Sequence, residues 1–387
     1  MSETSDQALV EFVSQLVRCR SVLGQESEVA QLVIAKMQEL GFDEAWIDPT
    51  GNAIGVIEGK QAGKTLVFDA HMDTVDVVPA IAWPRDPFSG LVEEGRIFGR
   101  GSSDMKGALA AMVFGLAEID RGAIRGKVAV SASVGEESIE GSALAKVLEQ
   151  VPADFVVIGE ASELKLVRAG RGRSEYVLET VGVPSHASSP QAGRNAVLEM
   201  MRWVQRLEGL EMPSDPFVGR GVMCLTDIIS EPYPAHSVVP SRCRATYERR
   251  LLPGETQEQV RQDLESAAVA GGVTEYRLTL AQARFETYTG ALLETSKWFP
   301  PWLIEEDHEV VRRASDGLSR AGLEVAFSAY QFCTNAAYTA GVADIPTLGF
   351  GPSRESLAHI VDEYLEVEQL LGARKGYLGI ATGLLGC

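Results

Sequence analysis

The chain has few cysteines and no arrangement of them that suits a metal site or a disulfide framework. Its five cysteines are scattered along 387 residues, and no two form a C-x-x-C pair. Disulfide-rich secreted domains carry even numbers of cysteines, and cysteine-ligated zinc sites use closely spaced pairs. The sequence therefore argues against both classes and favours reduced thiols.

Clusters of positive charge and long apolar runs are also missing. The formal net charge is −19 without any basic tract, which argues against a nucleic-acid partner because phosphate binding depends on Lys and Arg. No apolar stretch approaches the length of a membrane span, and the polar start MSETSDQALVEF lacks the pattern of a secretory leader. We expect a cytoplasmic protein with no nucleic-acid or membrane partner.

Residues 1–171 alternate between helix patterns and strand patterns. Helical apolar spacing follows Ser5 and Ser27, which we expect to act as helix caps. The β-branched segments TLVFDA, KVAVSAS and DFVVIG are separated by further helical segments. This order predicts a mostly parallel central sheet with flanking helices.

The pattern changes near residue 172. Residues 172–290 follow the order strand, helix, strand, strand, helix, strand, with the last strand expected over 273–285. This order predicts an α+β, ferredoxin-like unit with an antiparallel sheet. The first kind of pattern resumes over 291–387, so the predicted fold is an α/β domain in two parts, 1–171 and 291–387, interrupted by an inserted domain.

Side chains that can bind a metal follow several of the predicted strands. In open α/β sheets, ligands gather beyond the carboxyl ends of the strands. Here TLVFDA runs into HMD, KVAVSASV into GEES, DFVVIG into GEAS, and IPTLGF into GPSRESLAH, while GRGSSDMKG lies between the first two. The residues that could converge are His71, Asp104, Glu137, Glu160 and His359.

Two imidazoles and three carboxylates form a mixed ligand set that suits zinc, with cobalt or manganese as alternatives. Two ions that share one carboxylate, roughly 3.5–4 Å apart, can clamp a carbonyl and activate a water. Asp73 lies two residues after His71, so on an extended strand both side chains point to the same side. Asp73 is therefore placed to orient the imidazole.

Glu136 and Glu137 are adjacent carboxylates at the end of an apolar strand. Like charges repel each other, and burial adds to the cost of ionising them. The neighbouring sequence contains no cation to compensate this charge. A bound metal is the expected compensation.

The motifs HMD, GRGSSDMKG, GEES, GEAS and GFGP followed by AH and DE resemble the co-catalytic dinuclear zinc amidohydrolases and exopeptidases. This family includes acetylornithine deacetylase, succinyl-diaminopimelate desuccinylase and glutamate carboxypeptidase. The resemblance runs from about residue 5 to 385. The segments WFPPWLIEEDHEVV, FCTN and GFGPSRESLAH are closest to a subgroup named as selenium-metabolism-linked hydrolases.

The resemblance implies two Zn²⁺ ions and a role for each ligand. His71, Asp104 and Glu160 would hold one ion, and Asp104, Glu137 and His359 the other. Glu136 would be the general base, and Asp73 would orient His71. The resemblance also implies a cis peptide after Asp104.

The inserted domain, 172–290, resembles the family's lid and dimerisation domain. His186 matches a histidine that reaches the partner subunit's metal site in a homodimer, and Arg250 matches an arginine that binds the substrate carboxylate. Two positions depart from the common pattern: His236 stands where relatives often have Asn, and Asn335 where many have Asp. Both are expected near the substrate.

These features predict a metal-dependent hydrolase that cleaves the amide bond of a small N-acyl amino acid or dipeptide. A zinc-activated water would attack the carbonyl, with Glu136 as general base. One alternative is a ureido or N-carbamoyl amino acid amidohydrolase on the same metal site. Another is a non-catalytic binding protein of the same fold, which would be expected to lack the base or a ligand.

Overall fold

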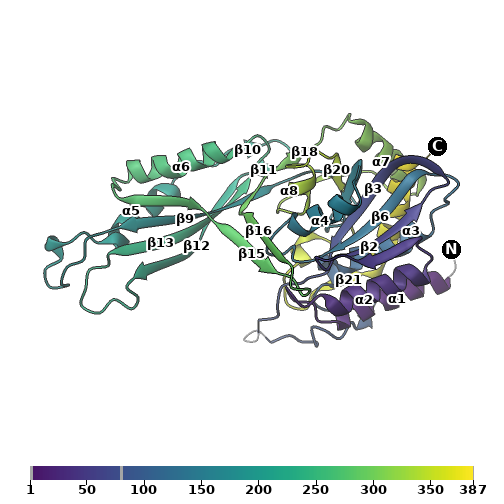
Figure 1. Cartoon of the computed structure of the whole chain (residues 1–387), viewed down its shortest axis with the longest axis horizontal. Coiled ribbons are helices and arrows are strands. Elements are labelled where there is room, and N and C mark those ends of the chain that lie inside the picture. Colours follow the sequence, from purple (N-terminus) through teal and green to yellow (C-terminus); the bar gives the residue numbers. More distant parts are fainter. Residues whose placement is uncertain (1–2, 79–81, 387) are drawn as a thin grey trace.

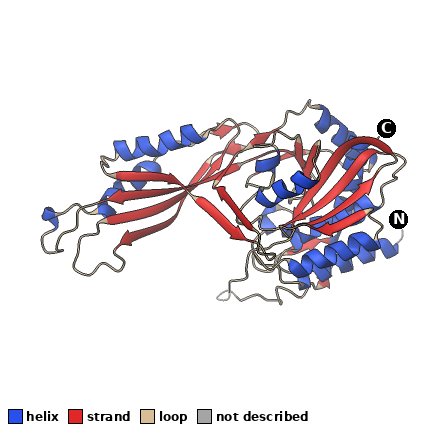
Figure 2. Ribbon diagram, viewed as in Figure 1, coloured by secondary structure: helices blue, strands red, loops and turns tan. Residues whose placement is uncertain are grey.

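The computed structural model describes residues 3–78 and 82–386, which form two main sheets with separate cores. The molecule is elongated: the larger sheet and most of the helices form one end, and the smaller sheet extends away from it (Figure 1). Figure 2 shows the strands of both ends in the same view. No helix in these two ranges has the length and apolar character needed to cross a membrane.

The larger sheet is parallel in its middle and antiparallel toward its edges. Its strands in spatial order are β1 (Glu44–Ile47), β2 (Ala53–Glu58), β6 (Arg125–Ser133), β3 (Gln61–His71), β7 (Phe155–Ile158), β20 (Thr347–Gly349), β8 (Leu166–Gly170) and β18 (Trp302–Leu303), with β19 (Phe327–Tyr330) also paired with β8. β3 is parallel to both β6 and β7, and β20 is parallel to β7. The predicted parallel centre is thus confirmed.

Helices cover both faces of this sheet. One face carries α1 (Glu3–Arg18), α2 (Ser27–Glu39), α3 (Gly107–Ala117), α7 (Glu309–Arg320) and α9 (Val367–Leu385), and the other carries α4 (Ser142–Gln150) and α8 (Ala336–Thr339). Alternation along β3 supplies both cores, since Phe68 packs on the first face and Val67 on the second. The expected serine caps are wrong: Ser5 lies inside α1, and Ser27 is the first residue of α2.

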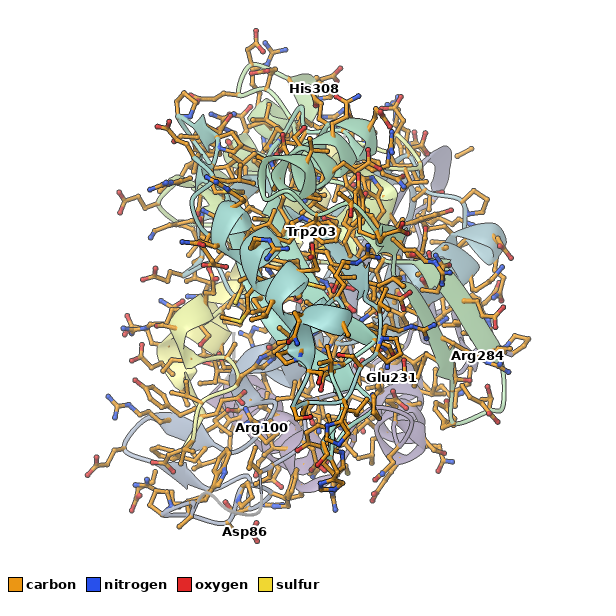
Figure 3. All side chains as sticks on the ribbon, turned by 90° about the vertical axis from the view of Figure 1, so that its left-hand side faces the viewer. Asp86, Arg100, Trp203, Glu231, Arg284 and His308 are labelled. Atoms are coloured by element: carbon orange, nitrogen blue, oxygen red, sulfur yellow. The ribbon has the colours of Figure 1, made fainter. Side chains whose placement is uncertain are left out.

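The smaller sheet confirms the predicted α+β unit. Its strands in spatial order are β12 (Val222–Glu231), β13 (Arg242–Leu251), β9 (Gly172–Val181) and β14 (Tyr276–Leu280), with β17 (Trp298–Phe299) paired with the start of β9. All of these pairs are antiparallel. The helices α5 (Ala196–Leu207) and α6 (Gln257–Ala270) complete its core around Trp203, whose indole donates to the Leu264 carbonyl at 2.9 Å (Figure 3).

The segment 273–285, expected to be one strand, is divided between two sheets. After β14 the chain leaves the smaller sheet, and β15 (Gln282–Glu286) pairs with β16 (Leu292–Ser296) as a hairpin. Phe285 and Leu293 pack in the core of the larger sheet, and the Tyr288 hydroxyl donates to the Gly51 carbonyl. The hairpin therefore belongs with the larger sheet, and we propose that the lid ends near Leu280 rather than at residue 290.

Two further groups of short strands lie outside the main sheets. They are β4 (Val92–Glu93), β5 (Arg96–Phe98) and β21 (Tyr364–Glu366) in one group, and β10 (Ser214–Asp215) and β11 (Gly219–Arg220) in the other. In the first group, β21 pairs with β5, which joins a C-terminal segment to one that precedes α3.

Candidate active site

Five side chains from different parts of the chain meet at the carboxyl edge of the parallel strands. His71 is the last residue of β3, and Asp104 lies in the irregular turn Ser102–Lys106 that leads into α3. Glu137 follows β6, Glu160 follows β7, and His359 follows β20. Parallel strands end at the same edge, so residues far apart in sequence are brought together there. The peptide bond between Asp104 and Met105 is cis, as the resemblance implied.

The Asp104 carboxylate lies between the two imidazoles. Its Oδ1 is 3.1 Å from His71 Nε2, and its Oδ2 is 3.1 Å from His359 Nε2. Each imidazole also faces a glutamate: Glu160 Oε1 is 3.5 Å from His71 Nε2, and Glu137 Oε1 is 3.0 Å from His359 Nε2. The structure therefore places all five expected ligand residues in two groups that share Asp104.

Negative charge exceeds positive charge in this cluster. Burial, followed by the charge of Asp104, raises the pKa of Glu160 to about 7 and also raises the pKa of Glu137. Hydrogen bonds to Asp104 and Glu137 raise the pKa of His359 to about 10. Burial favours neutral Asp104, but the hydrogen bonds from both imidazoles hold its pKa below the usual range. Without a bound cation to compensate the charge of the carboxylates, the site therefore holds protons.

Glu136 lies beside the cluster with part of its carboxylate unpaired. Its Oε2 is 4.0 Å from His71 Nε2, while its buried Oε1 has no hydrogen-bond partner among the described residues. Burial raises the pKa of Glu136 well above its usual range, and the neighbouring charges of Glu160 and Glu140 act in the same direction. A buried carboxylate with a raised pKa and a free oxygen is able to exchange a proton with a bound molecule.

Asp73 does not orient His71 in the way that the spacing predicted. The His71 Nδ1 lies 2.9 Å from the backbone carbonyl of Asp73, whereas the Asp73 carboxylate is 3.8 Å away. Both carboxylate oxygens instead accept hydrogen bonds from backbone N–H groups, those of Glu136 and Glu137, each at 3.1 Å. The carbonyl thus sets the imidazole tautomer, and the carboxylate holds the turn that carries the two glutamates.

Arg249 and Arg250 point to opposite faces of β13. Arg249 is buried in the smaller domain, where it pairs with Glu255 and Asp263. Arg250 is partly exposed and pairs with Glu248 at 2.8 Å. Alternation along the strand leaves only Arg250 accessible to a substrate.

Asn335, expected near the substrate, is buried inside the larger domain. Its Nδ2 donates to Asp69 Oδ2 at 2.7 Å and to Ser133 Oγ at 3.1 Å, and its Oδ1 accepts from Gly141 N at 2.6 Å. Asn335 is 3% exposed, so its amide is not accessible to a substrate. The prediction of a substrate contact is wrong, because Asn335 satisfies the buried Asp69 carboxylate.

We expect Asn335→Ala to lower stability rather than substrate affinity. The substitution leaves the Asp69 carboxylate and the Gly141 N–H without this partner, which should reduce the free energy of unfolding by roughly 2–4 kcal/mol. Denaturant unfolding and Michaelis kinetics would measure the two effects, with Gln331→Ala as the control. An unchanged unfolding midpoint together with a raised KM would contradict this role.

The two histidines of the inserted unit, His186 and His236, lie apart from the metal-ligand cluster within this chain. His186 Nδ1 is 2.7 Å from Ser188 Oγ, and the His186 backbone pairs with Val238. His236 is exposed and lies two residues before Val238. In the described ranges, neither imidazole forms a hydrogen bond or ion pair with a cluster residue, so their catalytic and substrate roles stay predictions.

Sequence reasoning missed three buried charged residues next to the site. Glu363 contacts the backbone of Asp104, and Arg100 contacts the backbone of His359. Their only sequence signal was their place in the motifs DE and GRGSSD, respectively. Glu26 precedes α2, where an acidic residue would be expected to be solvated. Its Oε1 accepts from the Gly24 N–H, and its Oε2 has no hydrogen-bond partner in the described part of the chain.

Glu26→Gln should stabilise the metal-free protein at alkaline pH. Burial, followed by the charge of Asp73, raises the pKa of Glu26 to about 7, so the folded state binds its proton more tightly than the unfolded state. Ionisation therefore costs wild-type stability as the pH rises from about 4.5 through 7, by up to about 3 kcal/mol, and glutamine avoids this cost.

Denaturant unfolding in the presence of a chelator would measure the difference at pH 8 and at pH 4.5. The gain should be present at pH 8 and small at pH 4.5. Glu39→Gln, at the exposed end of the same helix, is the control. An equal gain at both pH values would refute the assignment to Glu26 ionisation.

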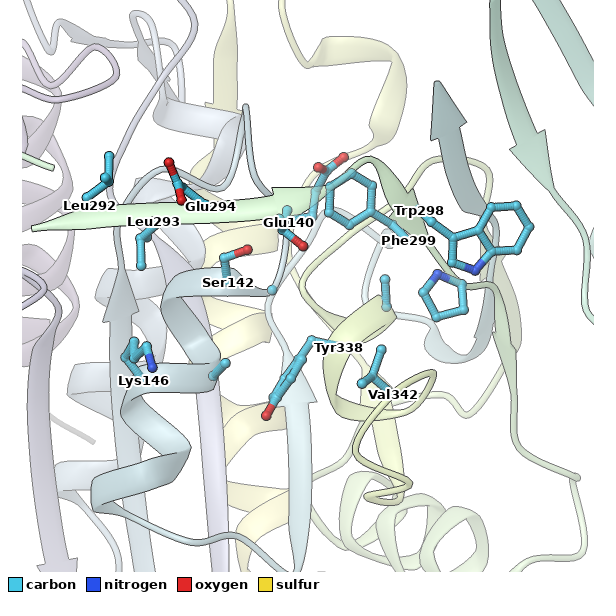
Figure 4. A pocket seen from close by; sticks show the side chains of 15 residues that line it. Glu140, Ser142, Lys146, Leu292, Leu293, Glu294, Trp298, Phe299, Tyr338 and Val342 are labelled. Atoms are coloured by element: carbon cyan, nitrogen blue, oxygen red, sulfur yellow. The ribbon is translucent and has the colours of Figure 1, made fainter. Parts of the chain in front are cut away.

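A cavity lies beside this cluster, not within it. It measures about 460 Å³ and is bounded by α4, β16, β17 and α8, with Trp298, Phe299 and Tyr338 among its lining residues (Figure 4). Glu140, also in the lining, pairs with Arg173 of β9 at 2.6 Å. The cavity therefore adjoins the junction between the two sheets and contains none of the five ligand-type residues.

Several known proteins resemble this chain along most of its length. The model of peptidase family M20/M25/M40 matches residues 67–382. The uncharacterized protein YgeY of Escherichia coli is 30% identical over 97% of this chain and 94% of its own length. Succinyl-diaminopimelate desuccinylase of Cereibacter sphaeroides is 28% identical over 96% and 97%. The solved structure of Bacillus subtilis YXEP, a dinuclear metal-binding M20 peptidase, shares the fold with a TM-score of 0.73, 14% identity and 99% coverage of both chains.

The family match and the relatives show the class of the protein: it is a hydrolase of amide bonds. Its structure contains candidate ligand groups for metal ions. It belongs to peptidase family M20/M25/M40.

Proposed function

We propose that the protein is a deacylase or exopeptidase that cleaves the amide bond of a small N-acyl amino acid or dipeptide with two metal ions. The observation that carries this proposal is the position of Asp104, whose two oxygens each face a different imidazole at 3.1 Å. A carboxylate shared in this way, with a further glutamate beside each histidine, is the arrangement of a two-ion site.

The donor set fits two divalent cations. Ligand atoms of His71, Asp104 and Glu137 lie within 4.8 Å of one another, and those of His71 and Glu160 are equally close, with the proposed base Glu136 beside them. Nitrogen and carboxylate oxygen donors suit Zn²⁺, with Co²⁺ or Mn²⁺ as alternatives. Bound cations would neutralise the excess carboxylate charge, polarise the substrate carbonyl and acidify a water molecule.

Glu136 supplies the proton transfer. One of its oxygens has no hydrogen-bond partner in residues 3–78 and 82–386, so it can accept a proton from the attacking water. As the bond between the carbonyl carbon and the nitrogen breaks, Glu136 returns that proton to the leaving amine. Asp73 keeps Glu136 in place through the backbone N–H groups of Glu136 and Glu137.

The lid would supply the remaining contacts. Arg250 has the planar fork of donors that suits the carboxylate of an amino acid. His236 would be a second substrate contact, and it lies in the lid loop that pairs with the segment containing His186. His186 would complete the site of a partner subunit in a homodimer. The outer strand β12 and the helix α5 expose Ile228, Leu198 and Met201, which would give such a dimer an apolar surface.

A hydrolysis screen with added Zn²⁺, Co²⁺ or Mn²⁺ tests the proposal. The substrates are N-acetyl, N-succinyl and N-carbamoyl amino acids and dipeptides. Release of an amino acid together with a carboxylic acid or a second amino acid supports it. Ammonia release from N-carbamoyl substrates alone would replace it with the ureido alternative, and metal-loaded protein that hydrolyses none of these compounds would overturn it.

A further inference from the structure

We propose that Glu363, together with Arg100, is a positioning residue that holds the two metal-ligand segments of the site in register. Glu363 is fully buried immediately before β21. Its Oε1 accepts hydrogen bonds from the backbone N–H groups of Ser103, at 2.9 Å, and Asp104, at 3.1 Å. One carboxylate oxygen thus fixes the backbone that presents Asp104 to both imidazoles.

The other carboxylate oxygen reaches the second segment through Arg100. Arg100 Nη1 donates to Glu363 Oε2 at 2.6 Å, and Arg100 Nη2 donates to the backbone carbonyl of His359 at 3.3 Å. Arg100 is 4% exposed, and its guanidinium lies 5.2 Å from the centre of the Trp83 ring. A single buried ion pair therefore contacts the backbone of both Asp104 and His359.

The His359 backbone is in a conformation that has to be held. Its φ is 63°, in the left-handed region that residues other than glycine seldom adopt. Two contacts hold the backbone of Glu363 in place. β21, which begins at the next residue, pairs with β5, and Gly99 N donates to the Glu363 carbonyl at 2.8 Å. The Arg100 contact then limits where the His359 imidazole can lie relative to Asp104.

Glutamine cannot replace Glu363 in these contacts. Its single carbonyl oxygen can accept from the two backbone N–H groups or from Arg100, but its NH₂ group then faces another donor on the opposite side. Partners that orient metal ligands in this way typically contribute 10–100-fold to metal affinity. This inference rests on the proposed function only through the metal ions that the cluster would bind.

The test compares Glu363→Gln with Asp362→Asn in the full-length protein. Asp362 is the neighbouring residue and pairs with Arg85 at 2.6 Å, but it makes no hydrogen bond or ion pair with Asp104 or His359 in the described structure. Each variant is stripped of metal and titrated with Co²⁺, and the visible absorption of the bound ion is recorded together with the thermal unfolding midpoint. We expect Glu363→Gln to bind Co²⁺ about 10–100-fold more weakly with an altered spectrum, and Asp362→Asn to match the wild type.

Two outcomes would overturn the inference: Co²⁺ affinity and spectrum unchanged in Glu363→Gln, or equal losses in both variants. If Glu363→Gln does not fold, Glu363→Asp takes its place: the shorter side chain keeps the charge but cannot reach all three partners, so it should bind Co²⁺ more weakly than the wild type, and unchanged affinity would overturn the inference. Failure of the proposed function is seen separately. Wild-type protein that binds Co²⁺ but cleaves no amide would refute that function and leave the metal-binding comparison intact.

Discussion

Glu136→Gln is expected to lose most turnover while keeping its metal. Glutamine has nearly the same size as glutamate but cannot take a proton from water, and general-base catalysis typically contributes 10²–10⁴-fold. We therefore expect kcat to fall about 10²–10⁴-fold. Metal content and the stabilisation of the protein by added metal should remain, because the five expected ligands are unchanged.

The same variant offers a second readout in the metal-free protein. Burial and the charges of neighbouring glutamates raise the pKa of Glu136, so its ionised form is costly in the folded state. Glu136→Gln should then unfold at a midpoint no lower than that of the wild type under chelation. Glu149→Gln, on the exposed face of α4, is the matched control. Near-normal turnover in Glu136→Gln would show that another group moves the proton.

Asp104→Asn is expected to abolish activity through loss of metal. Each oxygen of Asp104 faces one imidazole, so an amide in its place directs an NH₂ group into one of the two positions. The negative charge shared by both positions also disappears. We expect at least about a 10³-fold drop in kcat/KM, equivalent to about 4 kcal/mol of transition-state stabilisation.

Metal-dependent stability separates this prediction from a general folding defect. Wild-type protein at a metal concentration of about 100 times Kd should gain about 2.7 kcal/mol of unfolding free energy, and Asp104→Asn should gain little. Asp120→Asn, in an exposed turn, should respond as the wild type does. Full metal content in Asp104→Asn after gel filtration would rule out a shared-ligand role.

Several elements could be predicted from the sequence because their signals are local. The apolar segment TLVFDA forms β3 and ends at His71, and the βαββαβ order of the inserted unit needs only the alternation of its own residues. The positions of Glu137 and Glu160 after parallel strands follow in the same way, since such strands end at one edge.

Other features depend on contacts that no local pattern contains. The segment 273–285 has a continuous strand pattern, yet Phe285 enters the core of the larger sheet and Tyr288 bonds to Gly51. Asn335 resembles a substrate residue by position, but its amide faces Asp69 inside the domain. Burial of a polar side chain depends on which segments pack around it, and this information is distributed along the chain.

The sequence by itself determined an α/β fold with an inserted α+β unit, and it identified the strand ends that carry imidazoles and carboxylates. These properties follow from residue periodicity and from the direction of parallel strands. Only the tertiary structure decided that the Asp73 carbonyl orients His71 and that Glu363 holds the backbone of Asp104, 259 residues earlier. Hydrogen-bond partners are set by distances of a few ångströms between distant segments, and only the packed chain defines those distances.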